Sequence, residues 1–250
     1  MGCEGFKLTT VYRTRALDRS EFRRKCFALI VCFLISANAK ADSTCFGTTS
    51  NGRLENSCKL PASGENFTSY STVLRIAGRT YVHCTVEEIV LNAYASLSKT
   101  HPGIMYVYGE TGKKNGGSFK PHKTHQNGLS VDFMSPVVNI NGESVPLPTH
   151  ALNRYGYDID FTLAGEYKDL LLDYEALAAH IAALKAAASE AGVGIWRVLF
   201  DPKMQPALKK TKAWPEISDL TFSKRRSWVR HDDHFHIDFV IPCELSLIHI

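Results

Sequence analysis

Two short segments of the chain alternate histidine or aspartate with large apolar residues. Residues 129–133 read LSVDF, and residues 234–239 read HFHIDF. Successive side chains of a β-strand point to opposite faces, so each segment predicts a strand with one apolar, buried face and one polar face. The polar face carries Asp132 in the first strand, and two histidines and an aspartate in the second.

The two polar faces offer ligands for a metal ion. Gly128 lets the backbone turn so that His125 can fold back toward Asp132, and these two side chains could converge on one cation. His234 and His236 share the polar face of the second strand. A catalytic Zn²⁺ site has imidazole and carboxylate ligands at three positions and water at the fourth. A single His-x-His is weak evidence, because edge strands carry histidines without metal. Two such clusters together favour a site of two histidines and one aspartate.

Helices and strands are predicted to alternate along the chain. Apolar residues recur on one helical face from Thr85, where Thr85 and Glu88 form a capping box, until His101-Pro102-Gly103 ends the helix. The other predicted elements are strands at 104–108, 195–200 and 235–241 and a helix at 174–191. Residues 42–69 are rich in Gly, Ser, Thr and Asn and predict an irregular arm. This mixture indicates a single α+β domain over residues 42–244.

Residues 1–41 have the pattern of a leader, with a secretory signal peptide at about 23–41. A basic group at 23–25 precedes an apolar stretch at 26–36 and an A-x-A cleavage site at 39–41. Because a membrane span needs about 20 apolar residues, export with cleavage is favoured over an uncleaved anchor. At the other end, residues 245–250 (LSLIHI) resemble a non-native scar.

The leader also holds much of the positive charge. Residues 1–41 contain 8 of the 29 Lys and Arg and 3 of the 25 Asp and Glu. The remainder has a net charge of −1, which gives no electrostatic footprint for nucleic-acid binding.

Four of the seven cysteines follow the leader, at positions 45, 58, 84 and 243. An even number in an exported domain predicts two disulfides, and three connectivities are open. We favour Cys45 with Cys243, which would close a very long loop and so constrain the unfolded chain. None of the four belongs to a C-x-x-C pair, which argues against a thiolate zinc knuckle.

Several stretches match, in order along the chain, the motifs of one peptidase family. They are Ser50-Asn51-Gly52 with Leu60-Pro61, Gly116-Gly117-Ser118-Phe119, His122-x-x-His125-Gln126-x-Gly128-Leu129-x-Val131-Asp132, Arg197 to Pro202, and Trp228-x-x-His231-x-x-His234-x-His236. On these motifs the chain resembles the penicillin-insensitive murein endopeptidases, within a wider group that joins lysostaphin-type endopeptidases, D-Ala-D-Ala metallopeptidases and the hedgehog signalling domain.

The resemblance implies a role for six side chains. The Zn²⁺ ligands would be His125, Asp132 and His236. The catalytic residues would be His234, as the acid–base group, with His231 and His122 lining the site. Ser130 departs from the family pattern, which has an acidic residue there. The implied fold is a small central antiparallel sheet flanked by helices, as in hedgehog and the D-Ala-D-Ala peptidases.

Each of these residues has a simpler interpretation as well. His234 could be a structural hydrogen-bonding histidine, and His231 and His122 could be exposed loop residues. Trp196 and Trp228 are expected in the core rather than as substrate platforms. The histidines without a partner pattern are expected at the surface or with satisfied ring nitrogens, and they are His83, His101, His150 and His180.

The leader and the histidine clusters predict an exported zinc protein, and the resemblance implies a periplasmic endopeptidase that cuts peptide cross-links in bacterial peptidoglycan, between D-Ala and meso-diaminopimelate or between two diaminopimelates. His234 would move a proton between water and the leaving amine, and His231, if protonated, would stabilise the oxyanion. Arg230 is a candidate to contact a substrate carboxylate.

Two alternatives stay open: a D-Ala carboxypeptidase of the same group, and a non-catalytic, zinc-stabilised wall-binding module. The expected partners are peptidoglycan stem peptides, with no nucleic acid and no stable membrane span after signal cleavage. Whether the protein works with the apparatus of wall growth or with a secretion apparatus that passes through the wall stays open.

Overall fold

The structure is a computed structural model, and it describes residues 42–227 and 229–245. The predicted signal peptide, the cleavage site, Trp228 and all but the first residue of the predicted C-terminal scar lie outside the described residues. Within the described part of the chain, no helix is long and apolar enough to cross a membrane.

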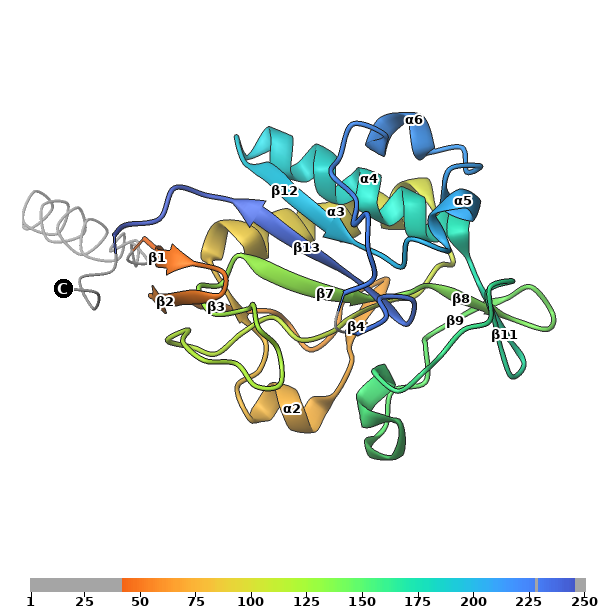
Figure 1. Cartoon of the computed structure of the whole chain (residues 1–250), viewed down its shortest axis with the longest axis horizontal. Coiled ribbons are helices and arrows are strands. Elements are labelled where there is room, and N and C mark those ends of the chain that lie inside the picture. The colour runs from red at the N-terminus through yellow and green to blue at the C-terminus, as the bar shows by residue number, and fades with distance from the viewer. Residues whose placement is uncertain (1–41, 228, 246–250) are drawn as a thin grey trace, which may run out of the picture. The chain divides into compact units, whose positions relative to one another are not determined.

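A five-stranded sheet forms the centre of the α+β fold (Figure 1). Its strands, in spatial order, are β12 (Gly194–Leu199), β13 (His234–Val240), β7 (Ser130–Met134), β6 (Tyr106–Tyr108) and β4 (Phe67–Ser69). Neighbouring strands are antiparallel except for β4 and β6, which are parallel. The predicted strands at 104–108, 195–200 and 235–241 are therefore present as β6, β12 and β13, with ends that shift by one or two residues.

Two long helices, α3 (Cys84–Thr100) and α4 (Tyr174–Glu190), lie side by side behind the sheet in Figure 1. The apolar face predicted for the first helix is buried as expected, with Val86, Ile89, Val90, Ala93, Tyr94 and Leu97 in the core. The predicted capping box is wrong. The helix begins one residue earlier, and the His83 ring Nδ1 accepts a hydrogen bond from the Thr85 backbone N–H at 3.2 Å. Both helices pack on one face, so the opposite face of the sheet is free to carry a site.

Shorter elements surround this centre. They are β1 (Thr44–Thr48), β2 (Asn51–Glu55), β3 (Cys58–Lys59), α2 (Thr72–Ile76), β5 (Tyr81–Val82), β8 (Val137–Asn139), β9 (Ser144–Val145), the 3₁₀ helix η1 (Ala151–Gly156), β10 (Glu166–Tyr167), β11 (Leu170–Leu172), α5 (Gln205–Leu208) and α6 (Trp214–Ile217). The strands among them form small separate sheets, β1–β2, β3–β5 and β10–β11–β8–β9.

The N-terminal arm is not irregular, which corrects the expectation from its composition. Strands β1 and β2 pair as an antiparallel hairpin in which Cys45 lies opposite Leu54, and both side chains are buried. The Cys45 carbonyl also accepts a hydrogen bond from the Glu244 backbone N–H, at 2.9 Å. Burial of these two side chains therefore outweighs the weak strand propensity of the Gly, Ser, Thr and Asn around them.

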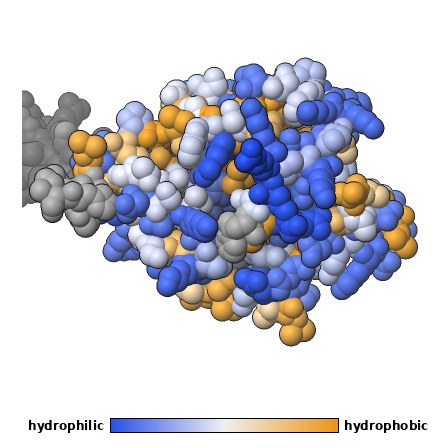
Figure 2. Space-filling view, in the orientation of Figure 1, coloured by the Kyte–Doolittle hydropathy of each residue, from blue (hydrophilic) through white to orange (hydrophobic). Residues whose placement is uncertain are grey.

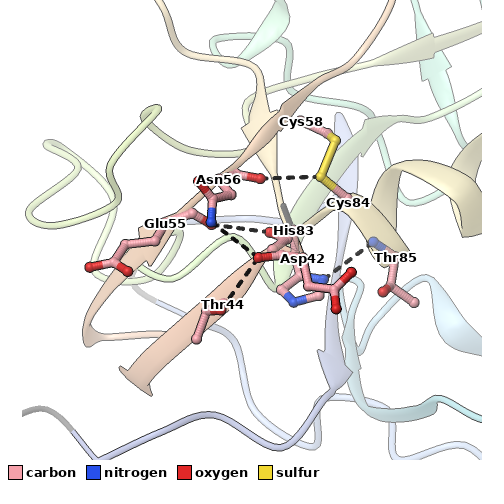
Figure 3. The surroundings of a disulfide bond; sticks show 9 residues. Asp42, Thr44, Glu55, Asn56, Cys58, His83, Cys84 and Thr85 are labelled. Carbon is pink, nitrogen blue, oxygen red and sulfur yellow. Dashed lines mark hydrogen bonds between the residues drawn. A yellow bond between two sulfur atoms is a disulfide. The ribbon is translucent and has the colours of Figure 1, made fainter. Parts of the chain in front are cut away.

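The residues that the structure describes form two disulfides. One joins the two ends of the domain, and the other joins β3 to the start of α3. Cys45 pairs with Cys243, as favoured from the sequence, over a separation of 198 residues. Cys58 pairs with Cys84 and joins β3 to the first residue of α3, beside the His83 cap (Figure 3). The disulfide to Cys243 holds the hairpin against the segment that follows β13.

Candidate metal centre

Strands β7 and β13 bring the two predicted polar stripes together. In the register of this antiparallel pair, Asp132 lies opposite His236 and Ser130 lies opposite Asp238. Residues directly opposite in adjacent strands share a face of the sheet. The predicted alternation is confirmed, because the intervening apolar residues Val131, Phe133, Phe235, Ile237 and Phe239 all belong to the core.

His125 reaches the same point from the loop before β7. Its backbone has a φ of 67°, in the left-handed region, and its side chain is fully buried. Ring atom Nδ1 lies 3.1 Å from the Thr111 carbonyl and donates to it, so Nε2 presents a lone pair. That Nε2 has no hydrogen-bond partner among the described residues and lies 3.2 Å from the Asp132 carboxylate oxygen Oδ1. Two buried acceptors facing each other are a site for a cation.

His236 presents its other ring nitrogen to the same carboxylate oxygen. Its Nε2 lies 2.9 Å from Asp238 Oδ1 and its Nδ1 lies 2.8 Å from Asp132 Oδ1. Burial lowers the pKa of His236, but Asp238 and Asp132 outweigh burial and raise the pKa to about 10. In turn, Asp238 accepts hydrogen bonds from Ser130 Oγ and Arg197 Nε, both at 2.5 Å. Asp238 therefore fixes which nitrogen of His236 faces Asp132.

His122 lies on the other side of Asp132. Its Nδ1 is 3.9 Å from Asp132 Oδ2, and its Nε2 is 2.6 Å from Glu110. The ligand atoms of His122, His125 and Asp132 all lie within 4.8 Å of one another, a group that could hold a metal ion. Burial alone would raise the pKa of Glu110, but hydrogen bonds from Arg79 and His122 lower the pKa to about 2, so this carboxylate is ionised and holds the His122 ring.

The donor set fits a borderline divalent metal. Imidazole nitrogens and a carboxylate oxygen are ligands that suit Zn²⁺, and each histidine has its remaining nitrogen tied to a carbonyl or carboxylate, as metal-bound histidines do. The unpartnered, buried His125 Nε2 is the observation in favour of such an ion.

Comparison with known proteins assigns the family. Residues 45–246 match the penicillin-insensitive murein endopeptidase family. The chain belongs to this family. No curated protein matches the chain. Membership makes the chain a peptidase and supports peptidoglycan as its substrate.

The other two predicted catalytic histidines of this murein endopeptidase family member are at the site as well. His234 is buried, with Nδ1 at 2.9 Å from Asp233 Oδ1 and Nε2 at 3.9 Å from Asp132 Oδ2. Burial lowers the pKa of His234, but Asp233 and Asp132 raise it above its usual value. The His231 ring lies 4.7 Å from the His234 ring, between centroids. Burial, with His234 and His236 nearby, lowers the pKa of His231 to about 2, so its ring is neutral in this arrangement.

Sequence reasoning missed Tyr157 and Glu110. The Tyr157 hydroxyl lies 2.9 Å from Asp132 Oδ2 and donates to it, and the same hydroxyl accepts the Glu110 backbone N–H at 2.9 Å. This hydrogen bond occupies Oδ2 and leaves Oδ1 to face His125 and His236. Both residues lie in loops, where no periodic pattern assigns a side chain to a face. Only their residue types, a carboxylate and a phenol, could have marked them as candidate site residues.

Ser130 has a structural explanation at the position where the resemblance led us to expect an acidic residue. Its hydroxyl faces Asp238 across the β7–β13 pair, inside a fully buried environment. An acidic residue at position 130 would set a second carboxylate against Asp238, and like charges directly opposite each other destabilise a sheet. The serine instead donates to the carboxylate that positions His236.

Trp196 is exposed, which corrects its expected place in the core. The side chain is 55% exposed and stacks against the Arg197 guanidinium, 4.3 Å from the ring centroid. Strand β12 has a register shift here: Ile195 pairs with Phe239, and Arg197 pairs with the adjacent residue Asp238. The extra residue is a bulge that turns Arg197 from the core face to the site face, where it reaches Asp238.

One of the remaining histidines, His180, differs from expectation. His180 is fully buried among aromatic rings, and neither ring nitrogen has a hydrogen-bond partner among the described residues. Burial lowers the pKa of His180 to about 3. His83 agrees with the expectation of a satisfied ring nitrogen, because its Nδ1 caps α3.

Two clefts meet at the centre. One, of about 370 Å³, is lined by residues that include Glu110, Tyr157 and His234. The other, of about 300 Å³, is lined by residues that include Asp132, His231 and His236. His122 and Val229 line both clefts. A substrate chain that crosses from one cleft to the other therefore passes His122 and the Asp132 carboxylate.

Proposed function

We propose that the chain is an exported zinc endopeptidase that hydrolyses peptide cross-links of peptidoglycan, with His125, Asp132 and His236 as the zinc ligands. One observation carries this ligand set. Nε2 of His125 and Nδ1 of His236 both face Asp132 Oδ1, at 3.2 and 2.8 Å. His122 faces the other oxygen at 3.9 Å, and Tyr157 already donates to that oxygen. We therefore prefer His236 to His122 as the third ligand.

A bound Zn²⁺ would polarise the peptide carbonyl and make water acidic enough to attack near neutral pH. His234 holds or moves the proton. Asp233 fixes its Nδ1, so its Nε2 points toward the site, where it can take a proton from water and pass it to the leaving amine.

We do not assign His231 the oxyanion-stabilising role that a protonated ring would have. Its Nδ1 donates to the Val229 carbonyl at 3.2 Å, and the neutral ring presents Nε2 as an acceptor. We propose that His231 orients water or a substrate N–H. His122, held by Glu110, lies between the two clefts and positions the chain that crosses them.

The metal assignment is tested by zinc analysis of purified protein from Asp42 onward. His125→Ala and His236→Ala are expected to lose bound zinc, whereas His122→Ala is expected to retain about one zinc per chain. Zinc loss in His122→Ala, with retention in His236→Ala, would mean that His122, and not His236, is the third zinc ligand. Full zinc in His125→Ala would reject the site itself.

The reaction is tested on purified peptidoglycan with analysis of the products. An endopeptidase converts cross-linked muropeptide dimers to monomers, and the identity of the monomers tells which cross-link is cut. Release of D-Ala alone would mean a carboxypeptidase. Retained zinc without any product would mean a wall-binding module. We place the protein in the periplasm, where its substrate is, and the two disulfides agree with an oxidising compartment. An association with a cell-wall or secretion apparatus remains part of the proposal.

A further inference from the structure

Positive charge is concentrated in one part of the sequence after the leader. Residues 201–230 contain 8 Lys and Arg against 3 Asp and Glu, whereas the rest of residues 42–250 contains 13 against 19. The net charge of −1 is therefore the sum of a basic segment at 201–230 and an acidic remainder. Part of this segment leads from α6 to β13 and crosses in front of the sheet in Figure 1, and strongly hydrophilic residues form a band on the same face (Figure 2).

A cleft of about 450 Å³ opens at this segment, within the size range of ligand pockets. Its lining is mostly apolar and cationic, and the residues are Phe161, Thr162, Leu163, Asp201, Pro202, Lys203, Lys224, Arg225, Arg226 and Arg230. The acidic residue in this lining, Asp201, forms an ion pair with Arg230. Phe161 is buried, and Lys224, Arg225 and Arg226 are exposed. We call this the cationic cleft.

Arg230, the residue that the sequence analysis offered as a contact for a substrate carboxylate, already has carboxylate partners in the protein. It lies within 3.4 Å of carboxylate oxygens of Asp160, Asp201 and Asp232, and it donates to the Phe161 carbonyl at 2.8 Å. These contacts join three segments and make Arg230 a wall of the cleft rather than a ligand contact.

The other four cations of the cleft are not neutralised in this way. Among the described residues, no ion pair involves Lys203, Lys224, Arg225 or Arg226. Four cations around one cleft repel each other, and an anion between them would relieve that repulsion.

The cationic cleft adjoins the proposed catalytic site. Arg230 lines both the cationic cleft and the 370 Å³ cleft, which also contains His122 and His234. A peptide that lies across the catalytic histidines and continues past Arg230 therefore enters the cationic cleft.

We propose that the cationic cleft binds a free carboxylate of the peptidoglycan stem peptide whose cross-link is being cut. The proposal rests on the proposed function. Cross-linked stems carry free carboxylates, and Arg225 and Arg226 offer planar forks that can bind a carboxylate through two hydrogen bonds. The apolar side chains of Leu163 and Pro202 accommodate the aliphatic part of the same stem. The cleft thereby selects stems that carry the free acid over stems in which it is amidated.

The test compares two variants on two substrates. Arg225→Gln with Arg226→Gln removes two cations from the cleft. Lys209→Gln with Lys210→Gln makes the same charge change at exposed residues that do not line it. Each zinc-loaded protein is assayed on a cross-linked muropeptide dimer with free carboxylates and on the same dimer with these carboxylates amidated.

For the first variant, KM on the free-acid dimer is expected to rise about 2- to 30-fold, the range for two rim charge contacts. The amidated dimer should have a raised KM already in the unchanged protein, and the first variant should raise it little further. The control variant should match the unchanged protein on both substrates.

Equal KM on the two dimers, or an equal effect of both variants, would overturn the carboxylate site while cleavage itself supports the proposed function. Absence of cleavage of either dimer by the unchanged, zinc-loaded protein would instead reject the proposed function. A second readout needs no activity: metal-stripped protein is sedimented with intact peptidoglycan, and the first variant should bind less than the control. Sedimentation that is the same for both variants would also count against the cationic cleft.

Discussion

The two carboxylate oxygens of Asp132 have different partners. Tyr157 donates to Oδ2, and ring nitrogens of His125 and His236 face Oδ1. A carboxylate with one oxygen held by the protein has one oxygen left for a cation, so its orientation is set before any ion binds. Such support from outside the ligand set commonly changes metal affinity by 10- to 100-fold when removed.

His234 distinguishes an enzyme from a zinc-stabilised scaffold. His234→Ala is expected to keep zinc and fold, because the ring faces the site without being one of the three proposed ligands. Cleavage of cross-linked muropeptides should fall by about 10²- to 10⁴-fold, the usual effect of losing a general acid or base. His101→Ala, in the exposed turn after α3, is the control and should retain full activity. Activity of His234→Ala within a few-fold of the unchanged protein would remove the proton-carrier role.

Asp238 is expected to act through His236. Asp238→Asn keeps the shape but weakens the hydrogen bond that fixes the His236 ring, so the Kd for zinc should rise about 10- to 100-fold. Competition with a chromogenic chelator measures this Kd directly, without an activity assay. Asp219→Asn removes an exposed carboxylate of the same length and should leave the Kd unchanged. An unchanged Kd in Asp238→Asn would show that the strand backbone alone positions His236.

The sequence predicted the ligand-bearing residues better than the groups that support them. Asp132 and His236 lie on strands, where a period of two assigns each side chain to a face from the order of residues alone. Glu110, Tyr157 and Arg197 could not be found in this way. The first two lie in loops, and Arg197 reaches the site only because a bulge reverses the phase of β12.

At the level of elements, patterns predicted long helices well and the N-terminal arm poorly. The helix that begins near Thr85 buries the six residues that its period of 3.6 selected. The hairpin β1–β2 has no comparable signal in its composition, because its stability comes from contacts distant in sequence, such as those of Cys45 with Cys243 and Glu244. Local propensity cannot report such contacts.

The loop that carries His125 depends on a close approach at Gly128. A Cβ at Gly128 would lie 2.5 Å from Leu54 Cδ2 and 2.7 Å from the His83 backbone nitrogen. Gly128→Ala should therefore lower the free energy of unfolding by about 2–4 kcal/mol, from the left-handed backbone and from overpacking together. Chemical denaturation measures the loss, and zinc binding should weaken because the loop shifts.

Gly117→Ala is the matched control. Gly117 has the same φ of 78° as Gly128, but a Cβ there would meet nothing within 4 Å. Gly117→Ala should lower the free energy of unfolding by about 1–2 kcal/mol, because only the left-handed backbone conformation is penalised there. Equal losses in the two variants would show that the contacts at Gly128 relax without cost.

For the whole molecule, the two disulfides constrain the unfolded chain to different degrees. Cys45–Cys243 spans 198 residues and Cys58–Cys84 spans 26. The entropy of loop closure gives about 5 kcal/mol for the first and about 3.5 kcal/mol for the second. The double variant Cys45→Ala with Cys243→Ala should therefore lose more stability than Cys58→Ala with Cys84→Ala.

Denaturant unfolding of the two double variants, both metal-free, measures this difference. The expected gap is about 1–2 kcal/mol, because other interactions of the four cysteines are small beside the loop term. Zinc affinity should be nearly unchanged in both, since neither disulfide touches the ligands. A smaller loss for the Cys45–Cys243 pair would mean that the β1–β2 hairpin opens separately from the rest, so that its disulfide constrains only a local unit. In that case the hairpin amides, and not those of β7 and β13, would exchange hydrogen faster in the Cys45 and Cys243 variant.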